Sequence, residues 1–336
     1  MDARLRIDRH SKSRRNRFTS VRLDRLVDQR DDPDWVEAAL QSKIARFVPL
    51  WRSRSLIDDS GEEHIAVYLK PGELADLDTI QPPTLLGTDG KRYFFAVSIN
   101  DEQRKQVISR HAGANFVDLR LASVNMDAKH AGVLAYARAL HYWQYRQNFC
   151  GICGAPTILQ SAGHKLVCSN EECSRQFFPR IDPAIIVLVT HGDACLLGRN
   201  AAWPPRRFST LAGFVEPGES LEDAVVREVH EEASVQLERI EYVSSQPWPF
   251  PASAMCGFFA EATSMDCEIS EELHELRWFT VAQLVEAVEN REVLLSPSVS
   301  IAFRLLAEWF ENNGGGDLEA LAKAARKRKS QGGRDR

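Results

Sequence analysis

Residues 213–235 read GFVEPGESLEDAVVREVHEEASV, which joins a glycine-containing loop to an acidic helix. Ser220 and Asp223 have the spacing of a capping box, so the helix is predicted to begin at Leu221. Apolar residues recur on one side of this helix, at positions 221, 224, 225, 229 and 233. The pattern therefore predicts a helix that packs one face into a core and exposes the other.

Three glutamates share the other face of this helix. Glu228, Glu231 and Glu232 are spaced i, i+3 and i+4, so their carboxylates are neighbours. Like charges at this spacing destabilise a helix by about 0.2–0.5 kcal/mol per pair unless a cation lies among them. Mg²⁺ or Mn²⁺ prefers oxygen ligands and keeps positions open for phosphate oxygens and water. Composition alone is typical of a solvated acidic face, but the loop glycines and Arg227, placed to pair with Glu219, favour a metal site.

Four of the seven cysteines form a cluster of two pairs. Cys150 pairs with Cys153 and Cys168 with Cys173, with fourteen residues between the pairs. Four thiolates complete a tetrahedral Zn²⁺ site that has no open position, so we expect a structural zinc ribbon in a reducing compartment. Zinc ribbons also bind nucleic acids, so that role stays open beside the role of a scaffold between domains.

The remaining patterns predict an α+β protein. An apolar strand over 184–190 is followed by a turn, a second strand over 194–198, the acidic helix, further strands and two closing helices. Upstream, short strands precede a helix over 127–147, in a region with no evident function. The predicted parts are an N-terminal α+β domain over 1–148 with a poorly patterned segment over 1–45, the zinc ribbon over 149–178, a third domain over 179–312, and a basic, disordered tail over 313–336.

Charge is distributed unevenly along the 336 residues. The net charge is −5, but residues 1–20 carry +5 and residues 323–336 carry +6, which leaves −16 elsewhere. A protein whose central part, residues 21–322, is this acidic needs metal ions or a few well-placed basic side chains to bind a polyphosphate. The basic ends are expected to be solvated arms, with a transit peptide as an alternative for 1–20 and an RNA contact as an alternative for Arg326–Lys329. No apolar run has the length of a membrane span, and we expect a cytoplasmic protein.

The stretch 213–235 resembles the Nudix box, G-x5-E-x7-R-E-U-x-E-E-x-G-U, in which U is aliphatic. The matching residues are Gly213, Glu219, Arg227, Glu228, Val229, Glu231, Glu232 and Val235. Ser234 stands where the family has Gly, at a helix end where a positive φ suits Gly, so a modest perturbation of that end is expected. The resemblance implies that 179–312 is a Nudix α/β/α sandwich with a mixed sheet, which hydrolyses a nucleoside diphosphate linked to another group.

A second stretch, Ser245–Ser253, reads SQPWPFPAS and looks like the SQPWPFPxS array of the NADH pyrophosphatase subfamily. Its prolines favour a rigid, extended segment, and its aromatic and polar side chains suit ring stacking and hydrogen bonding. Taken alone, the stretch is equally typical of a proline-rich connector with aromatic residues in the core. The substrate-binding residues that the resemblance implies here are Gln246, Pro247, Trp248, Pro249, Phe250, Pro251, Ala252 and Ser253.

The same resemblance implies the rest of the site. Phe178, where relatives have Tyr, would stack on the base across a homodimer interface, and Ala302 would contact the substrate. The catalytic and metal-binding residues implied are Glu228, Glu231, Glu232 and Glu272, together with the carbonyl of Ala212, and either Glu231 or Glu272 is the base. Catalytic Mg²⁺ or Mn²⁺ and structural Zn²⁺ are the implied cofactors. NAD(H) would give AMP and NMN(H), and NAD-capped RNA is a second implied substrate class.

Two other functions remain open at this point. A Nudix enzyme for ADP-ribose or an oxidised nucleotide would share the box, although the array over 245–253 argues against it. A zinc-ribbon protein that binds nucleic acid and carries an inactive hydrolase domain would share the cysteines, although the intact glutamates of the helix argue against it.

Overall fold

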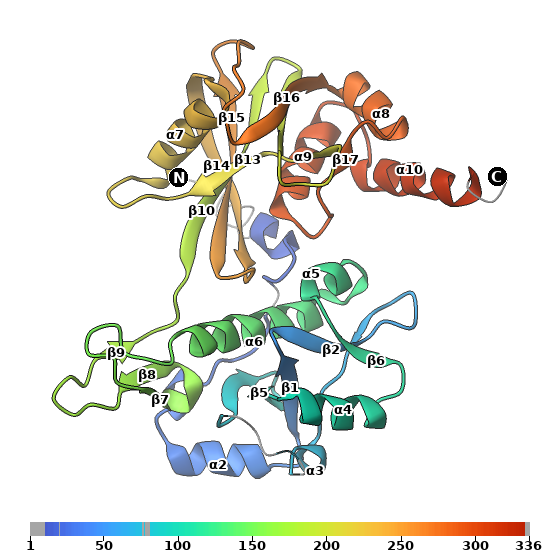
Figure 1. Ribbon diagram of the computed structural model, residues 1–336. Helices are drawn as coiled ribbons and strands as arrows, with labels where there is room; N and C mark the ends of the chain where they lie inside the picture. The colour runs from blue at the N-terminus through green and yellow to red at the C-terminus, as the bar shows by residue number, and fades with distance from the viewer. Residues whose placement is uncertain (1–10, 20, 76, 78–80, 333–336) are drawn as a thin grey trace. The chain divides into compact units, whose positions relative to one another are not determined.

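A computed structural model describes residues 11–19, 21–75, 77 and 81–332, without the side chains of 328–332. The chain divides into two compact units, each assembled from separate segments (Figure 1). The N-terminal unit comprises residues 17–181 and 247–253, and the C-terminal unit comprises 1–16, 182–246 and 254–336. The first half of the predicted basic arm, 1–10, and the last residues of the predicted tail, 333–336, lie outside the described residues.

The N-terminal unit contains a six-stranded sheet of order β3-β2-β1-β5-β4, in which β6 also pairs with β2. Its strands are β1 (Ala45–Trp51), β2 (Arg54–Asp58), β3 (Ile65–Ala66), β4 (Thr84–Thr88), β5 (Tyr93–Ser98) and β6 (Ala114–Val117). β1 and β5 are parallel, whereas β1 and β2 are antiparallel. Both faces of the sheet are buried, since Phe47 and Val48 of β1 enter two different cores.

Helix α6 (Ala128–Arg146) confirms the helix predicted over 127–147. Asp127 accepts hydrogen bonds from the backbone N–H groups of Lys129 and His130 and so caps its first turn. The other helical elements of this unit are η1 (Val27–Gln29), α2 (Pro33–Gln41), α3 (Pro71–Leu74), α4 (Asp101–Arg110), α5 (Leu119–Ala122) and η2 (Ser123–Asn125). The poorly patterned segment over 1–45 nevertheless contains α2, where Asp32 caps the helix and Pro33 occupies its first position.

The cysteine-containing segment also belongs to the N-terminal unit. It forms a three-stranded sheet of β7 (Thr157–Gln160), β8 (Lys165–Cys168) and β9 (Gln176–Phe177), with η3 (Ser161–Gly163) between the first two strands. Beside η3, the imidazole of His164 is buried and its Nε2 lies 2.7 Å from the carbonyl oxygen of Leu85. This contact ties the small sheet to β4.

Burial of His164 predicts a dependence of stability on pH. Burial lowers the pKa of this imidazole to about 4, whereas an unfolded histidine has a pKa of about 6.5. The unfolded chain therefore binds more protons between these values, and stability is lost as the pH falls from about 6.5 to about 4. We expect the contribution of His164 to the free energy of unfolding to fall by about 1.4 kcal/mol per pH unit in this window.

Chemical denaturation of the wild type and of His164→Gln between about pH 4 and 7 measures this slope. The Gln amide can still donate to Leu85 but does not titrate, so the variant should have the shallower slope. Zinc content measured in the same samples accounts for thiolate protonation, which is common to both proteins. Equal slopes would contradict the assignment.

The C-terminal unit contains a sheet of order β14-β15-β10-β11-β16, in which β13 also pairs with β10. Its strands are β10 (Asp182–His191), β11 (Ala194–Asn200), β13 (Leu211–Phe214), β14 (Leu237–Trp248), β15 (Ser253–Ala262) and β16 (Leu273–Thr280), and a separate pair joins β12 (Arg207–Phe208) to β17 (Leu294–Leu295). Side chains of β10 alternate between two cores: Ile185 and Val187 enter one, and Ile186 and Leu188 enter the other. Such a strand reads as a continuous apolar run because both of its faces are buried.

Helices cover both faces of this sheet. The first core lies under α7 (Leu221–Ala233) and the second under α8 (Val281–Glu289), α9 (Ile301–Asn312) and α10 (Leu318–Gly332). The predicted α/β/α sandwich within an α+β protein is therefore confirmed. Among the described helices, none is both long and apolar enough to cross a membrane.

The prediction of a disordered tail over 313–336 is wrong for residues 318–332, which form α10. Asp317 accepts hydrogen bonds from the N–H groups of Glu319 and Ala320 at the start of the helix. Leu318 and Ala325 are buried in the second core of the C-terminal unit. The helix forms because its apolar residues pack into this core. The many basic residues around them make the segment look polar in the sequence, so its apolar spacing is easily overlooked.

Candidate active site

The loop and helix over 213–235 form the centre of the site. The hydroxyl of Ser220 accepts a hydrogen bond from the N–H of Asp223, whose carboxylate accepts one from the N–H of Ser220. This is the predicted capping box, and α7 begins at Leu221 as expected. The apolar side of α7 is buried in the core through Ala224, Val225, Val229 and Ala233.

Arg227 joins the loop to the helix. Its guanidinium donates to both carboxylate oxygens of Glu219, at 3.0 and 2.7 Å, and to the carbonyl of Phe214 at 2.8 Å. It also donates to Glu228 at 2.9 Å and to Glu231 at 3.0 Å. The predicted pairing of Arg227 with Glu219 is confirmed, and the same cation also holds two of the three helix glutamates.

Glu232 is held differently. Burial, with the negative charges of Glu228 and Glu272, raises the pKa of Glu232 to about 7, although a hydrogen bond from the backbone of Ala212 opposes this shift. Its Oε2 atom is buried without a hydrogen-bond partner in the described part of the chain. An unpartnered buried oxygen is costly, and a bound cation would satisfy it.

The absence of a side chain at Gly213 allows the main chain to lie close to the carboxylate of Glu228. A Cβ atom at this position would lie 1.8 Å from the carboxyl carbon of Glu228, so a side chain here would displace the carboxylate. Burial raises the pKa of Glu228 despite the nearby Arg227. A cluster of carboxylate oxygens, one of them unpartnered, fits a hard divalent cation such as Mg²⁺ or Mn²⁺.

The remaining predicted ligands lie outside α7. Glu272 is exposed just before β16, and its charge raises the pKa of both Glu228 and Glu232, so it lies within electrostatic reach of them. Ala212 lies on β13 and pairs with Ile186 of β10. Among the described residues, the carboxylates do not converge within 4.8 Å as the cysteines do. Arg227 pairs with two of these carboxylates, Glu228 and Glu231, and so holds them toward its guanidinium.

Ser234, where the Nudix box has Gly, ends α7 in the left-handed region, with φ 55° and ψ 18°. This conformation costs a residue with a side chain about 1–2 kcal/mol. Replacing Ser234 by Gly should therefore raise the free energy of unfolding by about 0.5–1 kcal/mol after the greater unfolded-state entropy of Gly is allowed for. Urea denaturation measures the gain, and Ser234→Ala, which keeps the strain, should show none. A less stable Gly variant would contradict this explanation.

The four cysteines have the geometry of a zinc site. Their sulfur atoms all lie within 4.8 Å of one another, with 3.8 Å between Cys150 and Cys173 and 3.4 Å between Cys153 and Cys168. A tetrahedral site with Zn–S bonds of about 2.3 Å has sulfur–sulfur distances of about 3.8 Å. The N–H groups of Cys153 and Ile152 lower the pKa of the Cys150 thiol to about 7, which favours the thiolate that zinc needs, whereas burial raises the pKa of Cys168.

The array over 245–253 is not extended throughout. Residues up to Trp248 end β14, residues 249–252 form a turn, and Ser253 begins β15. The chain turns at the hydrogen bond from the N–H of Phe250 to the carbonyl of Trp248, which is 2.7 Å long. The extended form predicted from the prolines is therefore wrong for the middle of the array.

The aromatic residues of the array pack inside the N-terminal unit. Trp248 and Phe250 meet edge to face, with ring centroids 5.1 Å apart, and both contact the buried Phe18. The guanidinium of Arg138 lies 5.0 Å from the centre of the Phe250 ring and donates to the carbonyl of Pro249 at 2.8 Å. Much of the ring surface that was expected to contact a substrate is thus covered by other side chains of the N-terminal unit. Nothing in the sequence near Arg138 signalled this contact.

Gln246 lies buried in the C-terminal unit and fastens the start of α9. Its amide donates to the carbonyl of Val299 at 2.7 Å, and its side-chain oxygen accepts from the N–H of Ile301 at 2.8 Å. Ala302, the next residue, is also buried, with 3% of its surface exposed. Phe178, by contrast, follows β9 in the N-terminal unit and is 65% exposed. Of these three predicted contacts, Phe178 alone presents an open side chain.

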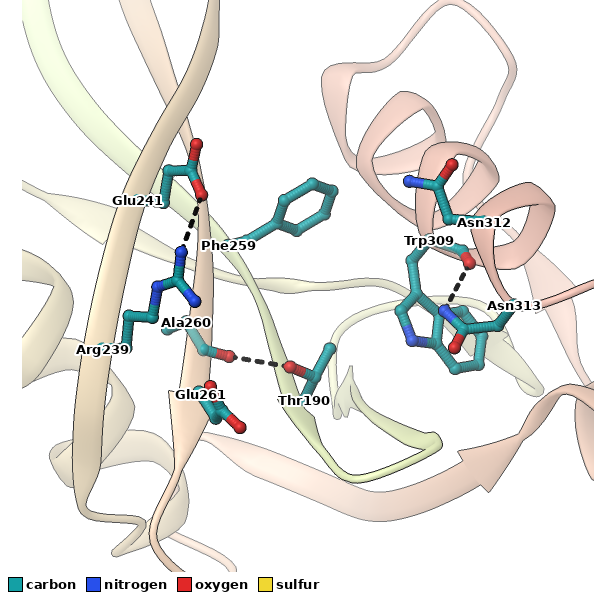
Figure 2. Close-up of a pocket in the computed structure, with 9 residues that line it drawn as sticks. All are labelled: Thr190, Arg239, Glu241, Phe259, Ala260, Glu261, Trp309, Asn312 and Asn313. Atoms are coloured by element: carbon teal, nitrogen blue, oxygen red, sulfur yellow. Dashed lines mark hydrogen bonds and ion pairs between the residues drawn. The ribbon is translucent and has the colours of Figure 1, made fainter.

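A hollow of about 240 Å³ lies elsewhere in the C-terminal unit (Figure 2). Phe259 of β15 and Trp309 of α9 lie on its two sides, and Arg239 and Glu241 of β14 form an ion pair at 3.8 Å on its rim. None of the predicted catalytic or substrate-binding residues lines it. The candidate site is therefore identified by its side-chain chemistry and not by this hollow.

Three parts of the chain match protein-family models. Residues 180–296 match the NUDIX domain, 44–143 the NADH pyrophosphatase-like rudimentary NUDIX domain, and 146–178 the NADH pyrophosphatase zinc ribbon domain. The NAD-capped RNA hydrolase NudC of Stutzerimonas stutzeri (strain A1501) is 36% identical over 253 residues, which cover 74% of this chain and 87% of that protein. The chain belongs to the NudC family of Nudix hydrolases.

Other relatives of this NudC family member differ in length. The NAD-capped RNA hydrolase NudC of Pseudomonas putida (strain W619) is 35% identical over 262 residues, 77% of this chain and 91% of that protein. The NAD-capped RNA hydrolase NUDT12 of Homo sapiens is 37% identical over 238 residues, 67% of this chain and 52% of that protein. The chain thus spans about half the length of the NUDT12 relatives that it matches.

The family also accounts for the N-terminal region, for which no function was evident from the sequence. The match over 44–143 makes it the rudimentary Nudix domain of a NudC family member. Its long helix, α6, contains no Asp or Glu and so offers no carboxylate to a divalent cation, unlike α7. This domain keeps no recognisable Nudix box, so its sequence gives no local sign of the fold.

Proposed function

We propose that this chain hydrolyses the diphosphate bond of NAD(H) to give AMP and NMN(H), and that it removes NAD caps from RNA by the same reaction. The observation that carries the proposal is the acidic face of α7, where Arg227 braces the loop while one oxygen of Glu232 is buried without a partner among the described residues. The relatives named NAD-capped RNA hydrolases support the choice of substrate.

Glu228, Glu232, Glu272 and the carbonyl of Ala212 would hold the catalytic cation, with Glu231 beside them. Mg²⁺ or Mn²⁺ bound there would supply the positive charge that lets a nucleophile approach a diphosphate. Residues 21–322 carry a net charge of −16, so an anionic diphosphate needs such a cation in order to bind there. Glu231, 59% exposed on α7, or Glu272 would take the proton from the attacking water.

The array would act on the substrate mainly through its main chain and its turn. Gln246 is a positioning residue in this proposal, because both ends of its amide hold residues 299–301 and hence the start of α9. Trp248, Pro249 and Phe250 fix the turn, and Pro247, Pro251, Ala252 and Ser253 present the surface on either side of it. Phe178 would supply the stacking ring.

A homodimer and a cytoplasmic location belong to the same proposal. Large apolar side chains are exposed in and beside the zinc ribbon, at Phe149, Ile152, Ile158, Phe178 and Ile181, as is typical of a protein–protein interface. All seven cysteines are free of disulfide bonds, which a reducing compartment would maintain. Analytical ultracentrifugation of the zinc-loaded protein tests the dimer.

Product analysis tests the proposed reaction. The zinc-loaded protein should convert NADH to AMP and NMNH when Mn²⁺ is added and should give no product when the divalent cation is withheld. Its kcat/KM for NADH should exceed that for ADP-ribose by about tenfold or more, because the two substrates share the diphosphate but differ in the group beyond it. Comparable rates on ADP-ribose would assign the chain to another substrate class. RNA binding without hydrolysis of any dinucleotide would support the rival nucleic-acid-binding protein.

A further inference from the structure

Helix α10 is anchored by one side only. Its apolar residues Leu318, Leu321, Ala322 and Ala325 are spaced i, i+3, i+4 and i+7 and so form one stripe. Leu318 and Ala325 are 1% and 6% exposed in the core beneath α8 and α9, and Leu321 and Ala322 pack against that core. The first two turns of α10 are therefore held in place by burial.

The character of the helix changes after Ala325. Residues 326–329 read RKRK, and no apolar residue follows before the helix ends at Gly332. Successive residues of an α-helix are about 100° apart, so these four basic positions are distributed around the whole circumference. Arg326 and Lys327 are exposed, and α10 extends past α8 and α9 toward the C-terminus (Figure 1). The core holds the first turns and presents a positively charged segment beyond them.

This segment differs in charge from the rest of the chain. Residues 323–336 carry +6, whereas residues 21–322 carry −16. Lys323 pairs with Glu319 at 3.0 Å, but both side chains are exposed, at 65% and 38%, and a phosphate can replace such a partner. A run of four consecutive basic residues, spread around a helix, matches the repeated phosphates of a nucleic acid. A membrane is the poorer match, because the apolar stripe that would enter a bilayer is already packed on the core.

We propose that α10 binds the phosphate backbone of the RNA that follows an NAD cap. This inference rests on the proposed function, in that NAD-capped RNA is the substrate. A free dinucleotide carries no phosphates beyond its diphosphate, so the contact strengthens binding of capped RNA and leaves binding of NADH unaltered. The binding is independent of base sequence, because phosphates carry no sequence information.

Charge neutralisation of this segment tests the proposal. The test variant carries four substitutions to Gln, which keeps helix propensity: Arg326→Gln, Lys327→Gln, Arg328→Gln and Lys329→Gln. The control variant lowers the net charge equally at four exposed lysines of the N-terminal unit: Lys43→Gln, Lys91→Gln, Lys105→Gln and Lys129→Gln. The probe is a single-stranded RNA of about 20 nucleotides with a 5′ monophosphate and a 3′ fluorophore, titrated by anisotropy over a range of KCl concentrations.

The test variant should bind this RNA about tenfold or more weakly at about 0.1 M salt. The slope of log K against log salt should become shallower by about 0.7 for each phosphate that the variant no longer neutralises, so by up to about 2.8. The control variant should bind like the wild type, as should the charge-conserving double variant Arg326→Lys/Arg328→Lys. Circular dichroism and thermal melting establish that all variants keep their fold.

Equal RNA affinity of the wild type and the test variant would overturn the proposal. If the test variant keeps its RNA affinity but no longer binds vesicles that contain phosphatidylserine, the result overturns the proposal and assigns α10 to a membrane. Kinetics on NADH and on NAD-capped RNA separate this inference from the proposed function. If the wild type hydrolyses neither, the proposed function fails, while the anisotropy result still decides whether α10 binds RNA.

Discussion

Replacing Glu231 by Gln is expected to lower the turnover of NADH by about a hundredfold or more, the loss typical of a missing general base. Of the three glutamates that share one face of α7, Glu231 alone is exposed, with 59% of its side chain accessible, so water can reach it. Arg227 holds one of its oxygens at 3.0 Å and fixes its orientation. Gln keeps the size and the hydrogen-bond acceptor of Glu but cannot take up a proton.

Steady-state kinetics of three variants decide the point. Glu272→Gln is the competing base variant, and Glu222→Gln, an exposed glutamate in the first turn of α7, is the control that should retain normal turnover. A Mn²⁺ titration of each variant separates loss of a base, which leaves the activation midpoint in place, from loss of a metal ligand, which raises it. Near-normal turnover of Glu231→Gln together with a large loss in Glu272→Gln would move the role to Glu272.

Removal of zinc is expected to unfold the ribbon over 149–178, and not merely to slow the reaction. The strands of this segment are two to four residues long, and several of its large apolar side chains, including Ile152 and Ile158, are exposed. So small a core provides little stability of its own, whereas zinc bound to four thiolates contributes about 10–16 kcal/mol in isolated zinc-finger peptides. We therefore expect metal binding to supply most of the folding energy of this segment.

Hydrogen exchange of the backbone amides measures the effect. Amides of β7 and β8 should exchange about a thousandfold faster in Cys168→Ser or after chelation, because local unfolding exposes them. Cys267→Ser, which changes a cysteine outside the cluster, should keep both the zinc and the protection. A zinc-free protein that melts at the same temperature and recovers full activity with Mg²⁺ alone would contradict a structural role for zinc.

Elements with complete local signals were predictable from the sequence. The helix expected over 127–147 is found at Ala128–Arg146, because Asp127 caps it and its apolar spacing is regular. α7 was predictable for the same reason, from its capping box and buried side. α10 was missed because basic residues dominate the average composition of its segment, while its four apolar positions are enough to anchor it.

Parts of the site that depend on close sequence spacing were also predictable. The carboxylates of α7 and the four thiols lie on local elements, so their spacing carries their geometry. The partners of the array were not predictable: Gln246 binds residues 299–301, and Phe250 contacts Phe18 and Arg138. These contacts exist only once distant segments have folded together, and local patterns hold no trace of them.

Neither unit is made from one continuous piece of chain, and this affects how the protein is synthesised. The N-terminal unit needs residues 247–253, whose Trp248 and Phe250 pack on the same core as Phe18. At about 5–20 residues per second, a ribosome reaches that segment roughly ten to fifty seconds after it has passed Phe18. For that time the nascent chain lacks two aromatic rings of its first core, so the apolar surface that these rings cover stays open to water during translation.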